Sequence, residues 1–299
     1  MGFLSGLEKF GLGKINKDNL FDDDDKTQEV LEKKKEAEKE AAAKKKTEYK
    51  ETDFLLFKTV HCPVCDETFR TRTVKTGKAR RLQPDFDLRP RFSNIDTNKY
   101  DVSSCQNCGY TAMHRYFPHL TKGQITLIKE EVCSKFQAPE SASEEQLDAY
   151  TYEQSIDLYK LALYNTVVKK GKTSEKAYAC LKISWLYRGW LEELEQQGIT
   201  DGDVVENCKK EEAEYYEEAY EGLVKAVASE SFPMCGMEES TMNLLLANMA
   251  YKLGKIDVAS KLVSSILVAP AASHQAKDRA MDLKEEILKT IHSEKEVAE

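Results

Sequence analysis

The stretch HCPVCDETF at residues 61–69 and the stretch SSCQNCGYTAMH at residues 103–114 each hold two cysteines separated by two residues. A turn of this form directs two thiolates to one metal ion, and two such turns complete a tetrahedral site. We therefore expect one structural Zn²⁺, with four ligands: Cys62, Cys65, Cys105 and Cys108. Gly109 follows the second pair where the backbone often needs a positive φ, and Asp66 is a poorer but tolerated residue after the first.

Two other interpretations of the cysteine pairs stay open. The sequence CPVC at residues 62–65 resembles a thioredoxin-like redox site, but such a site needs a strand–helix setting, and the alternating residues that follow predict a strand. Unrelated buried cysteines are the second alternative, although two pairs at identical spacing rarely arise by chance. Three histidines close by in the sequence could replace a thiolate: His61, His114 and His119. A polar surface histidine is the simpler interpretation of each.

The expected metal site is closed to substrate. Four cysteine ligands leave no position for water, so a catalytic metal is disfavoured. The sequence also has no phosphate-binding loop, nucleophile elbow or open metal motif. These observations favour a protein without enzymatic activity.

The segment between the cysteine pairs is basic. It contains eight positively charged residues: Arg70, Arg72, Lys75, Lys78, Arg80, Arg81, Arg89 and Arg91. With Phe69 and Phe86 among them, they could follow a phosphate backbone while the aromatic rings stack on bases. Alternatively, the arginines could pair with carboxylates of the same chain. A net charge of −8 disfavours binding of the whole chain to a polyanion, so nucleic acid is the second choice of partner.

Charge divides the chain into two parts. Residues 61–122 carry 11 Lys and Arg against 6 Asp and Glu, a difference of +5, whereas residues 140–299 carry 18 against 30, a difference of −12. The mean hydropathy is −0.58, and neither an apolar run of membrane-spanning length nor a secretory signal is present. Reduced thiols and a cytoplasmic location are therefore expected.

Residues 1–53 are expected to form a tail and a spacer. Residues 1–20 place apolar side chains at roughly helical spacing, diluted by glycines, which fits a loose tail or a peptide that docks on a membrane or protein. Residues 29–51 are almost entirely Glu, Lys and Ala, a composition that favours a helix without an apolar stripe. This stretch is therefore predicted to be a charged helical spacer.

The pattern after residue 145 predicts helices throughout. Three stretches share a small residue, a large residue four positions on, and a small or apolar residue three further. These triplets are Ser155, Tyr159 and Ala162; Ala219, Leu223 and Ala226; and Ala259, Val263 and Ile266. The spacing is similar to that of the second helix of a tetratricopeptide repeat, where small residues let paired helices approach closely. We expect helical hairpins that present a groove to a peptide or protein.

A further helix is predicted over residues 121–136. Thr121 and Gln124 match a capping box, which favours a helix start at this point. Four apolar residues fall on one face of this helix: Ile125, Ile128, Val132 and Phe136. We hypothesise that the cysteine module docks on the helical array through this face and through the basic segment. The densest acidic partner would be residues 211–221, which hold six glutamates.

These motifs together closely resemble a bacterial family catalogued as domain of unknown function 2225. The resemblance runs over about residues 54–136 and rests on CPVCDETF, TGKARRLQPDFDLRPRF and KYDVSSCQNCGYTAMHRYFPHLT. It implies a zinc-ribbon module joined to tetratricopeptide-like helices, and it assigns no activity. Asp66 departs from the glycine that is usual in such a turn.

The sequence thus predicts a mainly α protein with a small zinc-ribbon-like β module followed by a tetratricopeptide-like helical array. We expect a tail and spacer over residues 1–53, a zinc-binding module over 54–122 and a helical-repeat domain over 123–299. The favoured function is that of a protein-interaction or adaptor protein. The identity of the partner and the oligomeric state are not predicted.

Overall fold

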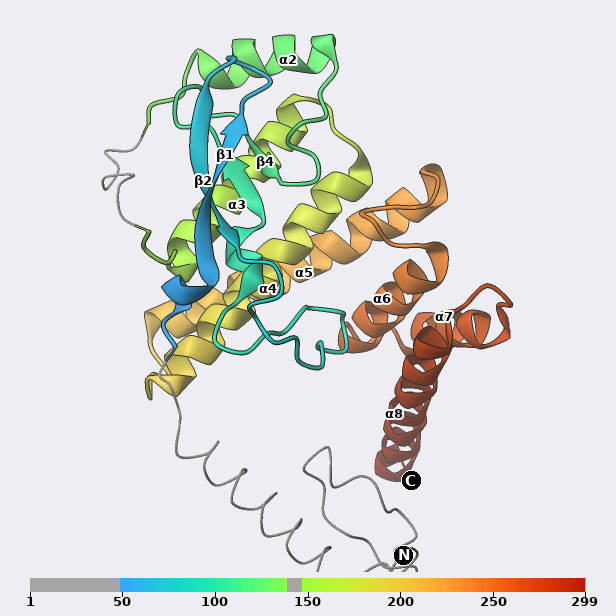
Figure 1. The fold of residues 1–299 in the computed structure, drawn as a ribbon. Coiled ribbons are helices and arrows are strands. Elements are labelled where there is room, and N and C mark those ends of the chain that lie inside the picture. The colour runs from blue at the N-terminus through green and yellow to red at the C-terminus, as the bar shows by residue number, and fades with distance from the viewer. Residues whose placement is uncertain (1–48, 139–146, 299) are drawn as a thin grey trace, which may run out of the picture. The chain divides into compact units, whose positions relative to one another are not determined.

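The computed structural model describes residues 49–138 and 147–298, apart from the side chains of 294–298. The expected N-terminal tail and nearly all of the charged spacer lie outside the described residues. Residues from Lys50 onward form one compact unit, in which two short antiparallel strand pairs precede a long helical region (Figure 1). The prediction of a mainly α protein with a small β module is confirmed.

Each strand pair is a hairpin closed by a cysteine pair. Strand β1 (Leu55–His61) pairs with β2 (Thr68–Val74), so that His61 lies opposite Thr68. Strand β3 (Val102–Ser104) pairs with β4 (Thr111–Met113), so that Ser104 lies opposite Thr111. The alternating TFRTRTV of β2 is rich in β-branched residues, which suits a half-buried strand.

The basic segment between the hairpins is mostly irregular. It doubles back on itself, with the Leu82 N–H donating to the Arg91 carbonyl and the Ser93 N–H donating to the Arg80 carbonyl, both at 2.9 Å. It then enters a short 3₁₀ helix (Thr97–Tyr100), where the Asp96 side chain accepts a hydrogen bond from the Asn98 N–H. A second 3₁₀ turn (Glu51–Phe54) precedes β1.

The helix predicted over residues 121–136 forms in two parts. Helix α2 (Lys122–Ile128) starts at the expected capping box of Thr121 and Gln124, and a π-helical turn (Lys129–Cys133) follows it. Ile128 and Val132 are buried in a cluster with the cysteine pairs and Tyr110. The expected apolar face is therefore buried against the cysteine module, and Val168 of the helical array joins the same cluster, so the expected contact with the array is confirmed.

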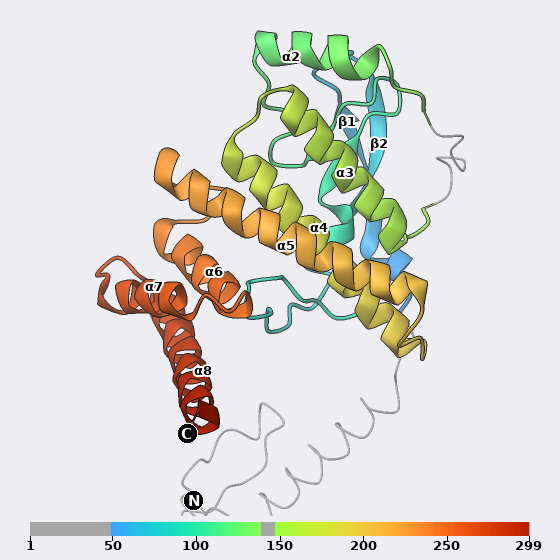
Figure 2. The same cartoon turned by 180° about the vertical axis from the view of Figure 1, so that it is seen from behind.

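Helices make up most of the described residues from Tyr152 onward. In order they are α3 (Tyr152–Val168), α4 (Thr173–Gln196), α5 (Asp203–Ser229), α6 (Glu239–Lys252), α7 (Ile256–Val268) and α8 (His274–Ala298). Helices α4 and α5 lie side by side, α6 and α7 form a second pair, and α8 packs against α7 (Figures 1 and 2). No helix in the described residues is apolar over a length that could cross a membrane.

The small and large residues that predicted helical hairpins lie in the core. All nine members of the three triplets are at most 2% exposed. The triplets of α5 and α7 belong to helices that pair with the helix before them. Helix α3 is different, because it packs on β4, β3 and α4, with Tyr159 and Ala162 in one cluster with Val102 and Met113. The β-hairpin formed by β3 and β4 is thereby packed into the core that the helices form.

Candidate metal centre

The first cysteine pair lies in the turn between β1 and β2. The Cys62 carbonyl accepts a hydrogen bond from the Asp66 N–H at 3.0 Å, and the Cys62 N–H donates to the Glu67 carbonyl at 2.8 Å. Asp66 has a φ of 70°, the left-handed conformation that the sequence suggested for this position. The turn brings the thiols of Cys62 and Cys65 to the same side.

The second cysteine pair repeats this arrangement between β3 and β4. The Cys105 carbonyl accepts from the Gly109 N–H at 2.8 Å, and the Cys105 N–H donates to the Tyr110 carbonyl at 2.9 Å. Gly109 has a φ of 76°. A Cβ atom at this position would lie 2.4 Å from the Phe136 ring, so both the backbone conformation and the packing require glycine.

The two turns bring the four predicted ligands together. The Sγ atoms of Cys62, Cys65, Cys105 and Cys108 all lie within 4.8 Å of one another. Cys62 and Cys108 are 3.6 Å apart between sulfurs, as are Cys65 and Cys105. These separations are far longer than the S–S bond of about 2.05 Å. The thiols are free, and their arrangement can hold one metal ion.

The protonation of the cluster also favours a bound cation. Hydrogen bonds from Cys108 and Cys62 lower the pKa of the Cys105 thiol well below its ordinary value. The hydrogen bond to Cys105 raises the pKa of the Cys62 thiol and also that of Cys108. The Cys105 thiolate is thus stabilised by hydrogen bonds from neighbouring thiols. If further thiols lose their protons, several negative charges lie close together, and a bound cation offsets their repulsion.

The structure places a fifth cysteine beside the four. Cys133 of the π-helical turn packs on the cluster. Burial raises the pKa of the Cys133 thiol. Cys133 was not identified from the sequence, although its position beside Val132, on the apolar face of a predicted helix, was a usable signal. The other three are free thiols packed among helices: Cys180, Cys208 and Cys235.

The nearby histidines lie outside the cluster of ligand atoms. His61 is exposed, and its Nε2 lies 3.1 Å from a carboxylate oxygen of Asp66. His114 lies beside Asp101, with 3.7 Å between Nδ1 and the carboxylate. His119 is exposed. Among the described residues, the cluster that can hold a metal ion therefore consists of cysteines.

Two arginines of the basic segment are bound to helix α4. Arg89 is 2% exposed, and it donates to both carboxylate oxygens of Glu192, from Nη1 at 2.8 Å and from Nη2 at 3.0 Å. Arg91 donates to the same carboxylate at 2.7 Å. Burial raises the pKa of Glu192, but the two arginines outweigh burial and leave this pKa lowered. The expected pairing between the basic segment and the helical array is confirmed for these two residues.

The expected acidic partner of that segment was wrong. Glu212, in the glutamate-rich segment 211–221, instead accepts hydrogen bonds from Arg188 of α4 at 2.9 Å and from Lys252 of α6 at 2.8 Å. Arg188 also reaches Asp87 of the basic segment at 2.8 Å. Helix α4 therefore binds the basic segment through charges of both signs. Arg188 of the helix pairs with the carboxylate of Asp87, and Glu192 pairs with the arginines of the segment.

The remaining basic residues lie along β2 and the start of the irregular segment. The Arg70 guanidinium stacks on the Phe57 ring at 4.0 Å, and that of Arg72 lies 4.6 Å from the Tyr150 ring. Lys75 donates to the Asp53 carbonyl at 2.9 Å. The other three are exposed: Lys78, Arg80 and Arg81. The eight residues thus do not form one continuous exposed patch.

Comparison with known proteins places most of the chain in one family. A family model described as an uncharacterized protein conserved in bacteria (DUF2225) matches residues 55–287, which include both cysteine pairs and most of the helical array. No curated protein and no solved structure matches the chain.

Proposed function

The chain belongs to this uncharacterized family conserved in bacteria, and we propose that it is a non-enzymatic interaction or adaptor protein with a structural zinc site. The observation that carries this proposal is the closure of the four-thiol cluster. Cys62 and Cys105 are fully buried, and the cluster supplies all four ligands of a tetrahedral ion. The ion would stabilise the fold, and the surface of the helices would perform the function.

The spacing of the thiols supports zinc as the metal. Zinc–sulfur bonds of about 2.3 Å in a tetrahedron put the sulfurs about 3.8 Å apart. Two sulfur pairs of the cluster lie at 3.6 Å. Thiolate ligands in tetrahedral geometry favour Zn²⁺ over Mg²⁺ or Ca²⁺, which prefer oxygen. A reducing compartment keeps such ligands available, so the proposal places the protein in the cytoplasm.

Metal content tests the zinc site directly. Protein purified anaerobically without added metal should contain about one Zn²⁺ per chain by elemental analysis. A chain that folds with no zinc, or with iron in its place, would contradict the proposal. Replacement of Cys180 by serine is the matched control, because Cys180 lies on α4 and outside the cluster.

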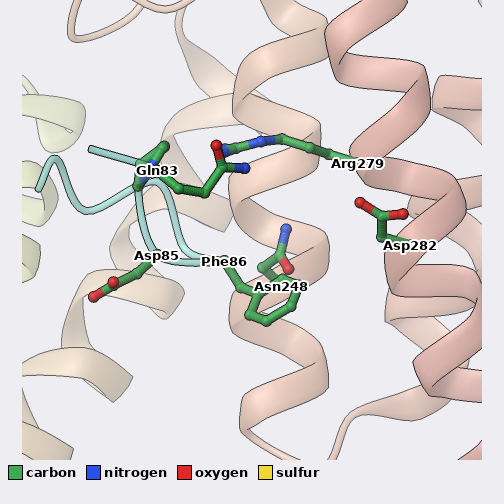
Figure 3. A pocket seen from close by; sticks show the side chains of 7 residues that line it. Gln83, Asp85, Phe86, Asn248, Arg279 and Asp282 are labelled. Atoms are coloured by element: carbon green, nitrogen blue, oxygen red, sulfur yellow. The ribbon is translucent and has the colours of Figure 1, made fainter. Parts of the chain in front are cut away.

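The proposed interaction surface lies on the helical array, whose hairpins we propose to be tetratricopeptide-like. A pocket of about 410 Å³ lies where the basic segment meets α6 and α8 (Figure 3). Its lining residues are Gln83, Pro84, Asp85, Phe86, Asn248, Arg279 and Asp282. A pocket of this size, within the range of small-molecule sites, has room for about one or two side chains of a partner segment.

Site-specific cross-linking in the native cell tests this surface. A photoreactive residue at Gln83 should capture a discrete protein partner, with nuclease-treated and untreated samples giving the same product. The same residue at Lys209, exposed on α5, is the control. Capture that depends on nucleic acid, or equal capture at both positions, would contradict the proposed interaction surface.

Nucleic-acid binding through the basic segment is the alternative that this proposal ranks second. Two of its eight basic residues are occupied by Glu192. Salt-dependent binding of oligonucleotides that is lost when Arg80 and Arg81 are replaced by alanine would favour the alternative. We expect no binding of single-stranded or duplex oligonucleotides at low salt.

A further inference from the structure

Two charged side chains of α8 face the pocket without a partner. Arg279 and Asp282 take part in no hydrogen bond or ion pair among the described residues. Asp85, the other charged lining residue, is different, since its carboxylate lies 3.6 Å from Arg89 and 3.7 Å from Arg188. The planar guanidinium of Arg279 is therefore available for a carboxylate of a ligand.

A buried amide adds an unused acceptor to the same pocket. Asn248 of α6 is 5% exposed, and its Nδ2 donates to the Leu244 carbonyl at 2.8 Å. Its Oδ1 accepts no hydrogen bond from the described residues. Because Asn248 lines the pocket, this oxygen is open to the N–H of a bound peptide. Figure 3 shows this amide between the side chains of Arg279 and Phe86.

An aromatic ring is held at the edge of the pocket. Phe86 is 68% exposed, although the adjacent Asp87 is 5% exposed and firmly bound. Asp87 accepts a hydrogen bond from the indole N–H of Trp185 at 3.1 Å and lies 2.8 Å from Arg188. The loop is therefore anchored, and together with Pro84 it offers apolar surface to a ligand side chain.

We infer that this pocket binds an extended peptide segment in which an acidic side chain lies beside an apolar side chain. Arg279 binds the carboxylate, Asn248 accepts a main-chain N–H, and Phe86 packs on the apolar side chain. The pocket disfavours a polyanion, because Asp85 and Asp282 lie in a lining that has one guanidinium. This inference rests on the proposed interaction function and names the chemistry of the partner.

Titration of the full chain with short peptides, followed by nuclear magnetic resonance, tests the inference. One pair is acetyl-Gly-Ala-Leu-Leu with a free C-terminal carboxylate or with an amide. The other pair is acetyl-Ala-Glu-Leu-Ala-amide and its glutamine counterpart. Selective binding of the glutamate peptide within the second pair supports the inference, whereas selectivity within the first pair alone would assign the site to a terminal carboxylate and overturn it. Acid and neutral forms that bind equally in both pairs, or that leave the signals of residues 83–86 unshifted, would overturn the inference.

Charge-matched variants of α8 provide the sharper test. Arg279→Gln should weaken binding of the acidic peptide about tenfold or more, because an ionic hydrogen-bonded pair is lost. Asp282→Asn should strengthen it, since a repelling carboxylate is removed. Lys277→Gln, which makes the same charge change on α8 outside the pocket lining, should leave binding unchanged. Equal effects of Arg279→Gln and Lys277→Gln would contradict the inference.

The two levels of the proposal fail in different ways. If the cross-linker at Gln83 captures a protein and Arg279→Gln does not alter that capture, the peptide chemistry is wrong while the interaction function stands. If no protein is captured by the cross-linker at Gln83 in the otherwise wild-type chain, the proposed interaction surface itself fails. An unchanged melting temperature of Arg279→Gln ensures that a loss of binding is not a loss of folding.

Discussion

The two cysteine turns make the same backbone hydrogen bonds in different surroundings. The outer turn, between β1 and β2, has an exposed Asp66 after a half-buried Cys65. The inner turn, between β3 and β4, has Gly109 against the Phe136 ring and a fully buried Tyr110. The inner hairpin also packs on α3, whereas the basic segment follows the outer hairpin and attaches to α4. The same local motif thus lies partly at the surface in the outer turn and within the core in the inner turn.

This difference explains which residue each turn tolerates. Both turns need a positive φ after the second cysteine, and an aspartate can adopt it at a cost of about 1–2 kcal/mol. Only the inner turn has a neighbour that a side chain would displace. Backbone conformation is therefore a local requirement, while tolerance to substitution depends on the contacts made from elsewhere in the chain.

Loss of a ligand cysteine should have the largest effect. Cys105→Ser and Cys65→Ser should both lose the metal, since binding contributes about 10–16 kcal/mol to the folding of small zinc modules. Hydrogen exchange should rise in both variants, and more across β1 and β2 than across β3 and β4, because the inner hairpin keeps its packing on α3. Metal analysis and exchange of each variant measure this, with Cys180→Ser as the control. An equal rise across the two hairpins would remove the distinction between the two turns.

Loss of Arg89 should come second. Arg89→Ala removes two hydrogen bonds to Glu192, which keeps Arg91 as a partner, and the loss of hydrogen bonds to a charged group costs about 1.5–3 kcal/mol. Urea unfolding should show this decrease in the free energy of unfolding, together with a loosened outer hairpin. Arg80→Ala, which changes an exposed side chain of the same segment, should stay within about 0.5 kcal/mol of wild type. Equal stabilities of the two variants would mean that the segment is not an anchor.

Substitution after the second cysteine should distinguish the two turns by a smaller amount. Gly109→Ala should destabilise by about 1–3 kcal/mol through backbone strain, with an added cost from the displaced Phe136 ring. Asp66→Gly should change stability by less than about 1 kcal/mol, because relief of strain offsets the added entropy of the unfolded chain. Thermal unfolding measures both. Combining Gly109→Ala with Phe136→Ala should not add the two costs, and full additivity would argue against the contact.

The smallest effect should come from His114, just after β4. Burial lowers the pKa of His114, Asp101 opposes this, and Lys58 adds to it. The neutral ring is thus favoured in the folded state, so its contribution is complete above the unfolded pKa of about 6.5 and is lost as the pH falls through the lower folded value. The free energy of unfolding should therefore fall less steeply between neutral and mildly acidic pH in His114→Gln. His61→Gln, on the exposed turn, is the control, and an unchanged slope in His114→Gln would contradict the expectation.

Local sequence predicted the elements whose cause is local. Paired thiols at fixed spacing identified the cluster, and the capping box of Thr121 and Gln124 placed the start of α2. The triplets of small and large residues marked positions that are buried in α3, α5 and α7. In each case the cause is a turn, a cap or a helical period, which neighbouring residues are sufficient to specify.

Long-range partners were beyond the sequence. The sequence contains many carboxylates and gives no reason to favour Glu192 over the glutamates of residues 211–221. Which carboxylate lies near the arginines depends on how α4 and the basic segment pack. The proximity of Cys133 to Cys108 has the same origin, because it depends on α2 and its π-helical turn covering the inner hairpin.

The sequence by itself therefore determined the four-thiol cluster, the mainly helical class and the burial of the helical triplets. Only the tertiary structure decided which carboxylate holds the basic segment, which cysteine turn joins the core, and where a pocket opens between the segment, α6 and α8. The physical reason is that spacing along a chain sets geometry over a few residues. Packing between distant elements sets which groups end up close together, buried or free to bind.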